Sequence, residues 1–65
     1  FVVVVFIKEG SANISVRGDG AREITLKAID GIDGATGGGH ENAAGAKIPS
    51  SFVELFKERV EKMVK

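Results

Sequence analysis

The chain opens on an uninterrupted apolar run. Phe1–Ile7 consists only of valine, isoleucine and phenylalanine. Such residues favour strands, and a strand without polar alternation is typical of one that is covered on both faces. The run is also far shorter than the ~20 residues that cross a bilayer. We therefore predict a strand at Phe1–Ile7 that lies in the centre of its sheet.

A second strand is expected directly after the first. Turn-forming residues at positions 10–13 are followed by Ile14–Arg17, where apolar and polar side chains alternate. We expect the two strands to form a hairpin. Because successive side chains point to opposite faces of a strand, Ser15 and Arg17 should share one face, away from the two apolar residues.

The middle of the chain has an ambiguous period. Apolar residues of Ala21–Ile32 recur both at every second and at every fourth position. We favour a short helix, which Gly31 can close in a left-handed conformation. Ala46–Ile48 is expected to form a brief third strand that ends at Pro49, which cannot donate to a ladder.

The C-terminal part predicts an amphipathic helix. Ser51 and Glu54 are spaced as in a capping box, which marks a helix start. Ion pairs are expected between Glu58 and Lys62 and between Glu61 and Lys65. The apolar stripe consists of Phe52, Val53, Phe56, Val60, Met63 and Val64, opposite a polar face of Glu54, Lys57, Glu58, Arg59, Glu61, Lys62 and Lys65. The predicted fold class is α/β, a small mixed β-sheet packed by this helix and the shorter one.

The segment between the two helices is rich in glycine: Gly34, Gly37, Gly38, Gly39 and Gly45. Each glycine costs about 0.5–1 kcal/mol of ordering relative to alanine, so the cluster indicates a backbone that closely approaches something. Successive amides of a glycine turn can hold an anion. The turn Gly37–His40 is therefore a candidate phosphate site, with Asn42 as a further donor. A mobile loop and a structural histidine are the alternatives.

Composition limits the remaining possibilities. The 65 residues allow one domain, 1–65, and the start on Phe1 indicates a fragment of a larger protein. Nine basic residues balance nine acidic ones, so the chain has no net charge that would attract phosphate groups. Any phosphate must therefore be bound by a small group of neighbouring residues. The sequence contains no cysteine, which excludes disulfides and thiolate metal sites and fits a cytoplasmic protein.

Three charged positions allow a plainer interpretation. Asp30 and Asp33 are three residues apart and could be metal ligands. The chain has only one histidine, however, and these carboxylates are more typical of a solvated, capped loop. Arg17 has nearby carboxylates at Asp19 and Glu23, with which it could form a surface ion pair.

One run resembles a known family. Thr36-Gly-Gly-Gly-His-Glu-Asn-Ala-Ala-Gly-Ala46 resembles the glycine motif of the DHH-associated C-terminal domain of the DHH phosphoesterases, and Ile14–Arg17 resembles the Ser-x-Arg strand before it. That group contains RecJ-type single-strand exonucleases, nanoRNA phosphatases and cyclic-dinucleotide phosphodiesterases. Thr36 stands where many members have a further glycine. The tail of alanyl-tRNA synthetases is a weaker match.

The resemblance implies the substrate-binding half of a metal-dependent phosphodiesterase or exonuclease. The other half, an upstream DHH domain with a manganese pair, is absent here, so the chain alone should hydrolyse nothing. Gly37, Gly38, Gly39 and His40 would contact the phosphate or neighbouring sugar of a nucleotide or single-stranded oligonucleotide, and Ser15 and Arg17 would hold a terminal phosphate. A purely structural domain, which forms a homodimer through the apolar strand, is the alternative.

Overall fold

The first two strands are joined by a tight turn. In the computed structural model, which describes residues 1–64, β1 (Val2–Lys8) and β2 (Ser11–Arg17) pair antiparallel. The turn residues Glu9 and Gly10 have φ of 50° and 80°. Two positive φ values match the twist of the flanking strands. The predicted hairpin is confirmed, although β2 begins at Ser11, three residues before the alternating segment.

Helix α1 (Ala21–Ile29) confirms the short helix predicted for the ambiguous segment. Its buried residues are Ala21, Thr25 and Ala28, which are three or four apart, so the helical period prevails over the alternating one. Gly31 follows with φ of 77° and ends the helix in the left-handed conformation that was predicted.

The glycine-rich segment is extended, and the turn predicted for Gly37–His40 is wrong. Thr36–His40 forms β3, which pairs antiparallel with β4 (Ala43–Pro49). The predicted strand Ala46–Ile48 is thus the second half of a longer strand, the fourth in the chain. Glycine and alanine have low intrinsic strand propensity, so only pairing with neighbouring strands reveals these elements.

The sheet has the order β1-β2-β4-β3. The α/β class with a packed C-terminal helix is confirmed, but all three strand pairs of the described residues are antiparallel, so the sheet is not mixed. The central position predicted for Phe1–Ile7 is also wrong, because β1 is an edge strand. Its composition reflects strand propensity and does not report how many neighbours the strand has.

Helix α2 (Val53–Val64) follows a 3₁₀ turn, η1 (Ser50–Phe52). The predicted stripe is confirmed where Val53, Phe56 and Val60 are buried, whereas Val64 remains 43% exposed. The predicted capping box is wrong: among the described residues neither Ser51 nor Glu54 makes a side-chain hydrogen bond, and Glu54 pairs with Lys57 at 3.8 Å. A backbone hydrogen bond from Val53 N–H to Ser50 O closes the 3₁₀ turn that leads into the helix.

One residue predicted for the polar face of α2 has a different place. Arg59 is partly buried and donates to the carbonyl oxygens of Ala28 (3.0 Å) and Asp30 (2.7 Å), which joins α2 to the end of α1. The predicted pair Glu58–Lys62 is confirmed at 3.6 Å. The pair predicted for Glu61 and Lys65 lies outside the described residues.

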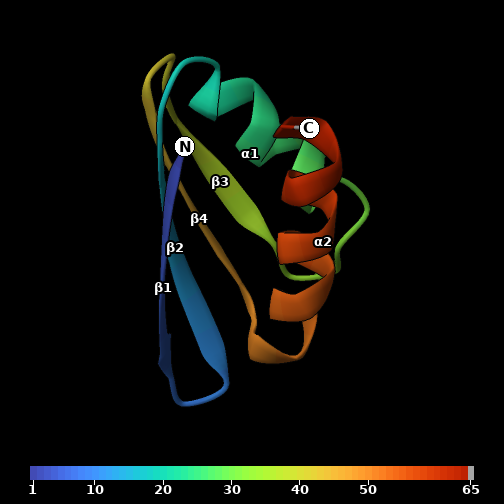
Figure 1. Cartoon of the computed structure of the whole chain (residues 1–65). Coiled ribbons are helices and arrows are strands. Elements are labelled where there is room, and N and C mark those ends of the chain that lie inside the picture. The colour runs from blue at the N-terminus through green and yellow to red at the C-terminus, as the bar shows by residue number, and fades with distance from the viewer. Residues whose placement is uncertain (65) are drawn as a thin grey trace.

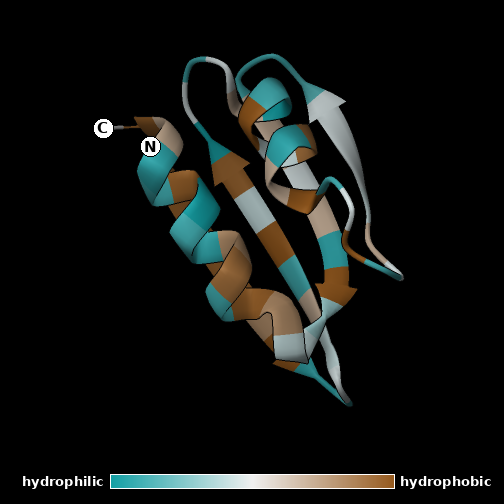
Figure 2. Ribbon diagram, turned by 90° about the vertical axis from the view of Figure 1, so that its right-hand side faces the viewer, coloured by the Kyte–Doolittle hydropathy of each residue, from teal (hydrophilic) through white to brown (hydrophobic). Residues whose placement is uncertain are grey.

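Both helices pack on the same face of the sheet. Figure 1 shows the sheet nearly edge-on with α1 and α2 on one side, and Figure 2 shows both helices in front of it. The core between these layers includes Ala12, Ile14 and Val16 of β2, Ala46 and Ile48 of β4, and Phe56 of α2. No described element covers the opposite face, which we call the open face. In the part of the chain that is described, neither helix has the length and apolarity to span a membrane.

Candidate functional site

The strand register brings residues from distant parts of the sequence together on the open face. Arg17 pairs with Ala43, and Ala43 with His40. Ser15 likewise pairs with Gly45, and Gly45 with Gly38. Residues that face each other across strands share a face of the sheet. Because Ile14 and Val16 point into the core, both rows lie on the open face.

The two rows enclose a floor almost without side chains. Neighbouring strands lie ~4.8 Å apart, so the Cα atoms of Arg17 and His40 are about 10 Å apart. Between them lies only the methyl group of Ala43, and the adjacent row has hydrogen atoms at Gly45 and Gly38. A flat or extended ligand can therefore lie against this floor between a guanidinium and an imidazole group.

The three consecutive glycines have different surroundings. A Cβ atom on Gly37 would lie 2.9 Å from Ile29 Cδ1, and one on Gly39 would lie 2.6 Å from both Ala43 O and Ala44 Cα. Gly39 also has φ of 145°. A Cβ on Gly38 would meet no atom within 4 Å. Packing therefore accounts for Gly37 and Gly39, which face the helices, but not for Gly38.

The extended backbone changes how this segment can bind an anion. Amide groups of a strand alternate between its two edges, so successive amides do not converge in one concavity as they would in a turn. β3 lies at an edge of the sheet, where alternate amides point away from β4. Any anion contact of this segment therefore uses separate edge amides and the side chains of the open face.

Asn42 lies in the two-residue turn between β3 and β4. Its carbonyl oxygen accepts a hydrogen bond from Gly18 N (3.0 Å), and the Glu41 oxygen accepts one from Arg22 N (3.4 Å). These bonds join the turn to the segment directly after Arg17 and hold one end of the Arg17–His40 row. The structure thus brings Ser15, Arg17, Gly38 and His40 together, and places Asn42, Gly37 and Gly39 off the open face.

The open face of the sheet differs in charge from the rest of the molecule. The charged strand residues are Lys8, Arg17 and Lys47, and the register puts all three on the open face with His40. All nine acidic residues of the chain lie in turns, loops and helices. The open face is therefore positive although the chain has no net charge. Sequence reasoning missed Lys8 and Lys47, and the available signal was that each belongs to a strand without carboxylates.

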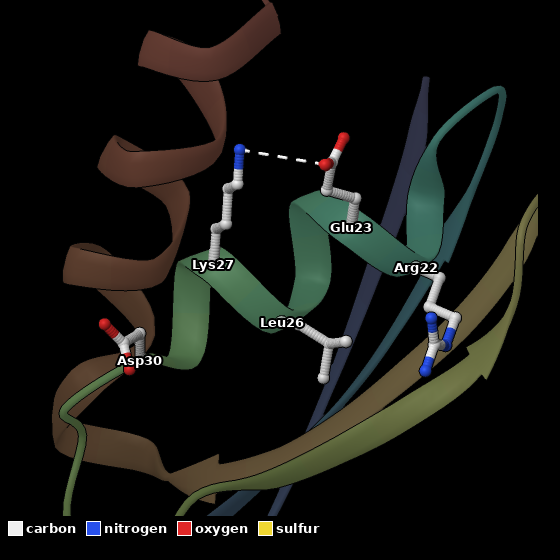
Figure 3. Close-up of a pocket in the computed structure, with 5 residues that line it drawn as sticks. All are labelled: Arg22, Glu23, Leu26, Lys27 and Asp30. Carbon is white, nitrogen blue, oxygen red and sulfur yellow. Dashed lines mark ion pairs between the residues drawn. The ribbon is translucent and has the colours of Figure 1, made fainter.

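The alternative for Arg17, a surface ion pair with Asp19 or Glu23, is not found among residues 1–64. Glu23 pairs with Lys27 at 3.8 Å instead, and within residues 1–64 Arg17 has no acidic partner within 4.0 Å. Figure 3 shows the Glu23–Lys27 pair beside a shallow hollow on α1, with Arg22 and Leu26 directed toward the sheet. This hollow lies on the helix side, whereas Arg17 lies on the open face without an acidic partner among residues 1–64.

Metal binding has no matching set of side chains here. No group of three or more histidine, cysteine, aspartate or glutamate residues is arranged to hold an ion in the described part of the chain. Asp30 and Asp33 both lie in the loop between α1 and β3. The resemblance implies the manganese pair for the upstream DHH domain and not for these residues.

The comparison with protein families agrees with the motif and its setting. The DHHA1 domain family matches residues 1–65, the whole chain. A search of the curated proteins found no match. Together with the Ser-x-Arg strand and the glycine strand, which share the open face, the match over the full length shows that this chain belongs to the DHHA1 family, the C-terminal domain associated with the DHH phosphoesterases.

Proposed function

We propose that the open face binds the phosphate-bearing end of a nucleotide or single-stranded oligonucleotide, as the substrate-binding half of a DHH-type phosphodiesterase or exonuclease. One observation carries this proposal: Arg17 and His40 stand in one row with only the methyl group of Ala43 between them, on a face whose charged strand residues are all basic. The association of DHHA1 domains with DHH phosphoesterases supports it.

Each residue of the two rows has a chemical role in this proposal. The planar guanidinium of Arg17 can grip a phosphate through two parallel hydrogen bonds, and the Ser15 hydroxyl, two residues along the same face, can donate a further one. His40 donates from the opposite side of the floor. Gly38 and Gly45 leave room for the sugar or base to lie flat.

In this proposal, these residues bind the substrate and orient it. Holding the terminal phosphate fixes the position of the bond to be cleaved relative to the upstream DHH domain, and such positioning supplies a large part of enzymatic rate enhancement. The metal pair implied for that domain would supply an activated water. The chain itself contributes affinity and orientation, and bond cleavage is assigned to the neighbouring domain.

The experiment is an NMR titration of the chain with thymidine 5′-monophosphate. We expect amide shifts to centre on Ser15, Arg17, Gly38 and His40, and Arg17→Ala to weaken binding about 10-fold or more, because hydrogen bonds to charged groups contribute ~1.5–3 kcal/mol. Lys27→Ala, which removes a cation from the helix side, is the matched control. Equal losses in both variants would show that the open face is not the site.

A second candidate function is homodimer formation through β1. This edge strand is uncharged from Val2 to Ile7, and Val2, Val4, Phe6 and Ile7 are each more than half exposed. An unprotected edge of this kind favours pairing with another strand. Antiparallel pairing of two copies about Val4 would place only apolar residues opposite each other. Sedimentation should then reveal a dimer that Val4→Lys abolishes and Val64→Lys, on α2, does not; a monomer at several hundred micromolar would exclude this function.

A further inference from the structure

A third row of side chains crosses the open face beyond the row of Ser15. The register aligns Phe6 with Asn13, Asn13 with Lys47, and Lys47 with Thr36. We call these four residues the distal row. They lie on the open face because the neighbouring residues Ala12 and Ile48 are buried in the core. Nothing in the proposed phosphate site uses the distal row.

The distal row is too far from Arg17 to serve the same phosphate. It lies four residues from the Arg17 row along β2, and at ~3.3 Å per residue this is about 13 Å. A single strand advances about 3.4 Å per nucleotide when stacked, and more when extended. Two to four nucleotides therefore cover the distance, whereas one nucleotide held at Arg17 does not.

The side chains of the distal row suit the repeating parts of a nucleic-acid strand. Phe6 is 63% exposed, so its ring can stack on a base of any sequence. Lys47 is exposed and has no acidic partner within 4.0 Å among residues 1–64, so its ammonium group can contact a phosphate. The Asn13 side chain, exposed between them, can donate and accept hydrogen bonds.

We propose that the distal row is a second subsite and that the open face takes a single-stranded oligonucleotide of several nucleotides, running from Arg17 toward Lys47 and Phe6. This inference rests on the proposed function and extends it. Charge complementarity favours a polyanion, because the charged strand residues on this face are all basic. An aromatic side chain in the same row as Lys47 favours bases over an acidic peptide.

The test compares two probes, thymidine 5′-monophosphate and a 5′-phosphorylated thymidine tetranucleotide, in NMR titrations of the chain. We expect Phe6→Ala and Lys47→Ala each to weaken tetranucleotide binding at least about fivefold, which corresponds to ~1 kcal/mol, the lower end of base stacking. Binding of the monophosphate should stay within twofold. Lys47→Ala should also reduce the salt dependence of tetranucleotide binding by about 0.7 in log K against log[salt].

Matched controls come from the same elements. Ile7→Ala removes an apolar side chain of similar exposure from the same strand but the opposite face, and Lys57→Ala removes a cation from α2. Neither should affect tetranucleotide binding. Retained dispersion of the amide spectrum confirms that each variant is folded.

The outcomes separate the two proposals. If Arg17→Ala weakens both probes while Phe6→Ala and Lys47→Ala leave the tetranucleotide unaffected, the second subsite is wrong and the proposed function stands. If Arg17→Ala also has no effect, the proposed function fails with it. Polyglutamate that binds as tightly as the tetranucleotide, and loses as much on Lys47→Ala, would overturn the choice of a nucleic-acid ligand.

Discussion

The two faces of the sheet are built from the same strands and differ in almost every property. In β2, the covered face receives Ala12, Ile14 and Val16, all buried, while the open face receives the exposed Asn13, Ser15 and Arg17. Along β2, residues that build the core thus alternate with residues at the surface. The difference teaches that the core and the candidate site can be changed separately, although they are interleaved along the chain.

The glycine triplet shows the same division within three residues. Gly37 and Gly39 face the helices, where a side chain would collide with Ile29 or with β4. Gly38 faces the open side, where nothing lies within 4 Å of an added Cβ. A motif that reads as uniform in the sequence therefore combines two packing positions with one position that is free to meet a ligand.

The largest predicted effect is that of Gly39→Ala. The new Cβ would lie 2.6 Å from two backbone atoms of β4, at a φ of 145° that alanine rarely adopts. Strain and overpacking each cost about 1–3 kcal/mol, so we expect the free energy of unfolding to fall by at least ~2 kcal/mol. Urea denaturation followed by circular dichroism measures this change, which is large for a chain of 65 residues.

The control is Gly38→Ala, one residue away. Its Cβ enters open space, and alanine lowers the entropy of the unfolded chain, so stability should stay within about 1 kcal/mol of wild type. Affinity for thymidine 5′-monophosphate should fall because the methyl group rises from the floor of the site. Equal destabilisation by both alanine variants would contradict the division between the faces.

Arg59→Ala should have the next largest effect, on the covered side. Its guanidinium satisfies two carbonyl oxygens at the end of α1, Ala28 O and Asp30 O, and is a cation at a helix C-terminus. Hydrogen bonds to charged groups contribute about 1.5–3 kcal/mol, and we expect a loss in this range in denaturant unfolding. Lys62→Ala, which removes only the exposed pair with Glu58, should cost less than ~0.5 kcal/mol.

The sequence predicted those parts of the fold that depend on local pattern. Period and turn chemistry were enough for the first hairpin, for α1 with Gly31, and for the buried stripe Val53, Phe56 and Val60. Strand order is a property of pairing between distant segments, which no local pattern reports. This is why β1 was expected in the centre of the sheet, and why β3, built of glycine, was expected to be a turn.

The candidate site could be predicted only as separate residues. The alternation in β2 correctly put Ser15 and Arg17 on one face, but His40 joins them only through the register of β4 between them. The positive charge of the open face was likewise hidden, because Lys8, Arg17 and Lys47 are far apart in the sequence and cancel against carboxylates of the helices and loops. Net charge averages over faces that a ligand meets one at a time.

Thr25→Val should act in the opposite direction. Thr25 is fully buried on the covered side, and among the described residues its hydroxyl oxygen has no hydrogen-bond partner. Valine keeps the shape and removes the unsatisfied group, so we expect a gain of about 1 kcal/mol in the free energy of unfolding. Thr25→Ser, which keeps the hydroxyl and loses the methyl group, should instead destabilise by a similar amount. A destabilising valine would mean that the hydroxyl is bonded in solution.

The smallest effects on stability should come from the open face itself. The side chains of Ser15, Arg17 and Lys47 are exposed, and none of them makes a hydrogen bond or ion pair with another residue of the range 1–64. Exposed substitutions without such partners usually change stability by less than about 0.5 kcal/mol. We expect each alanine variant to unfold at nearly the wild-type urea concentration, while Arg17→Ala and Lys47→Ala lose ligand affinity. A loss above ~1 kcal/mol from any of them would mean that the open face also carries folding contacts, and the separation of the two faces would then fail.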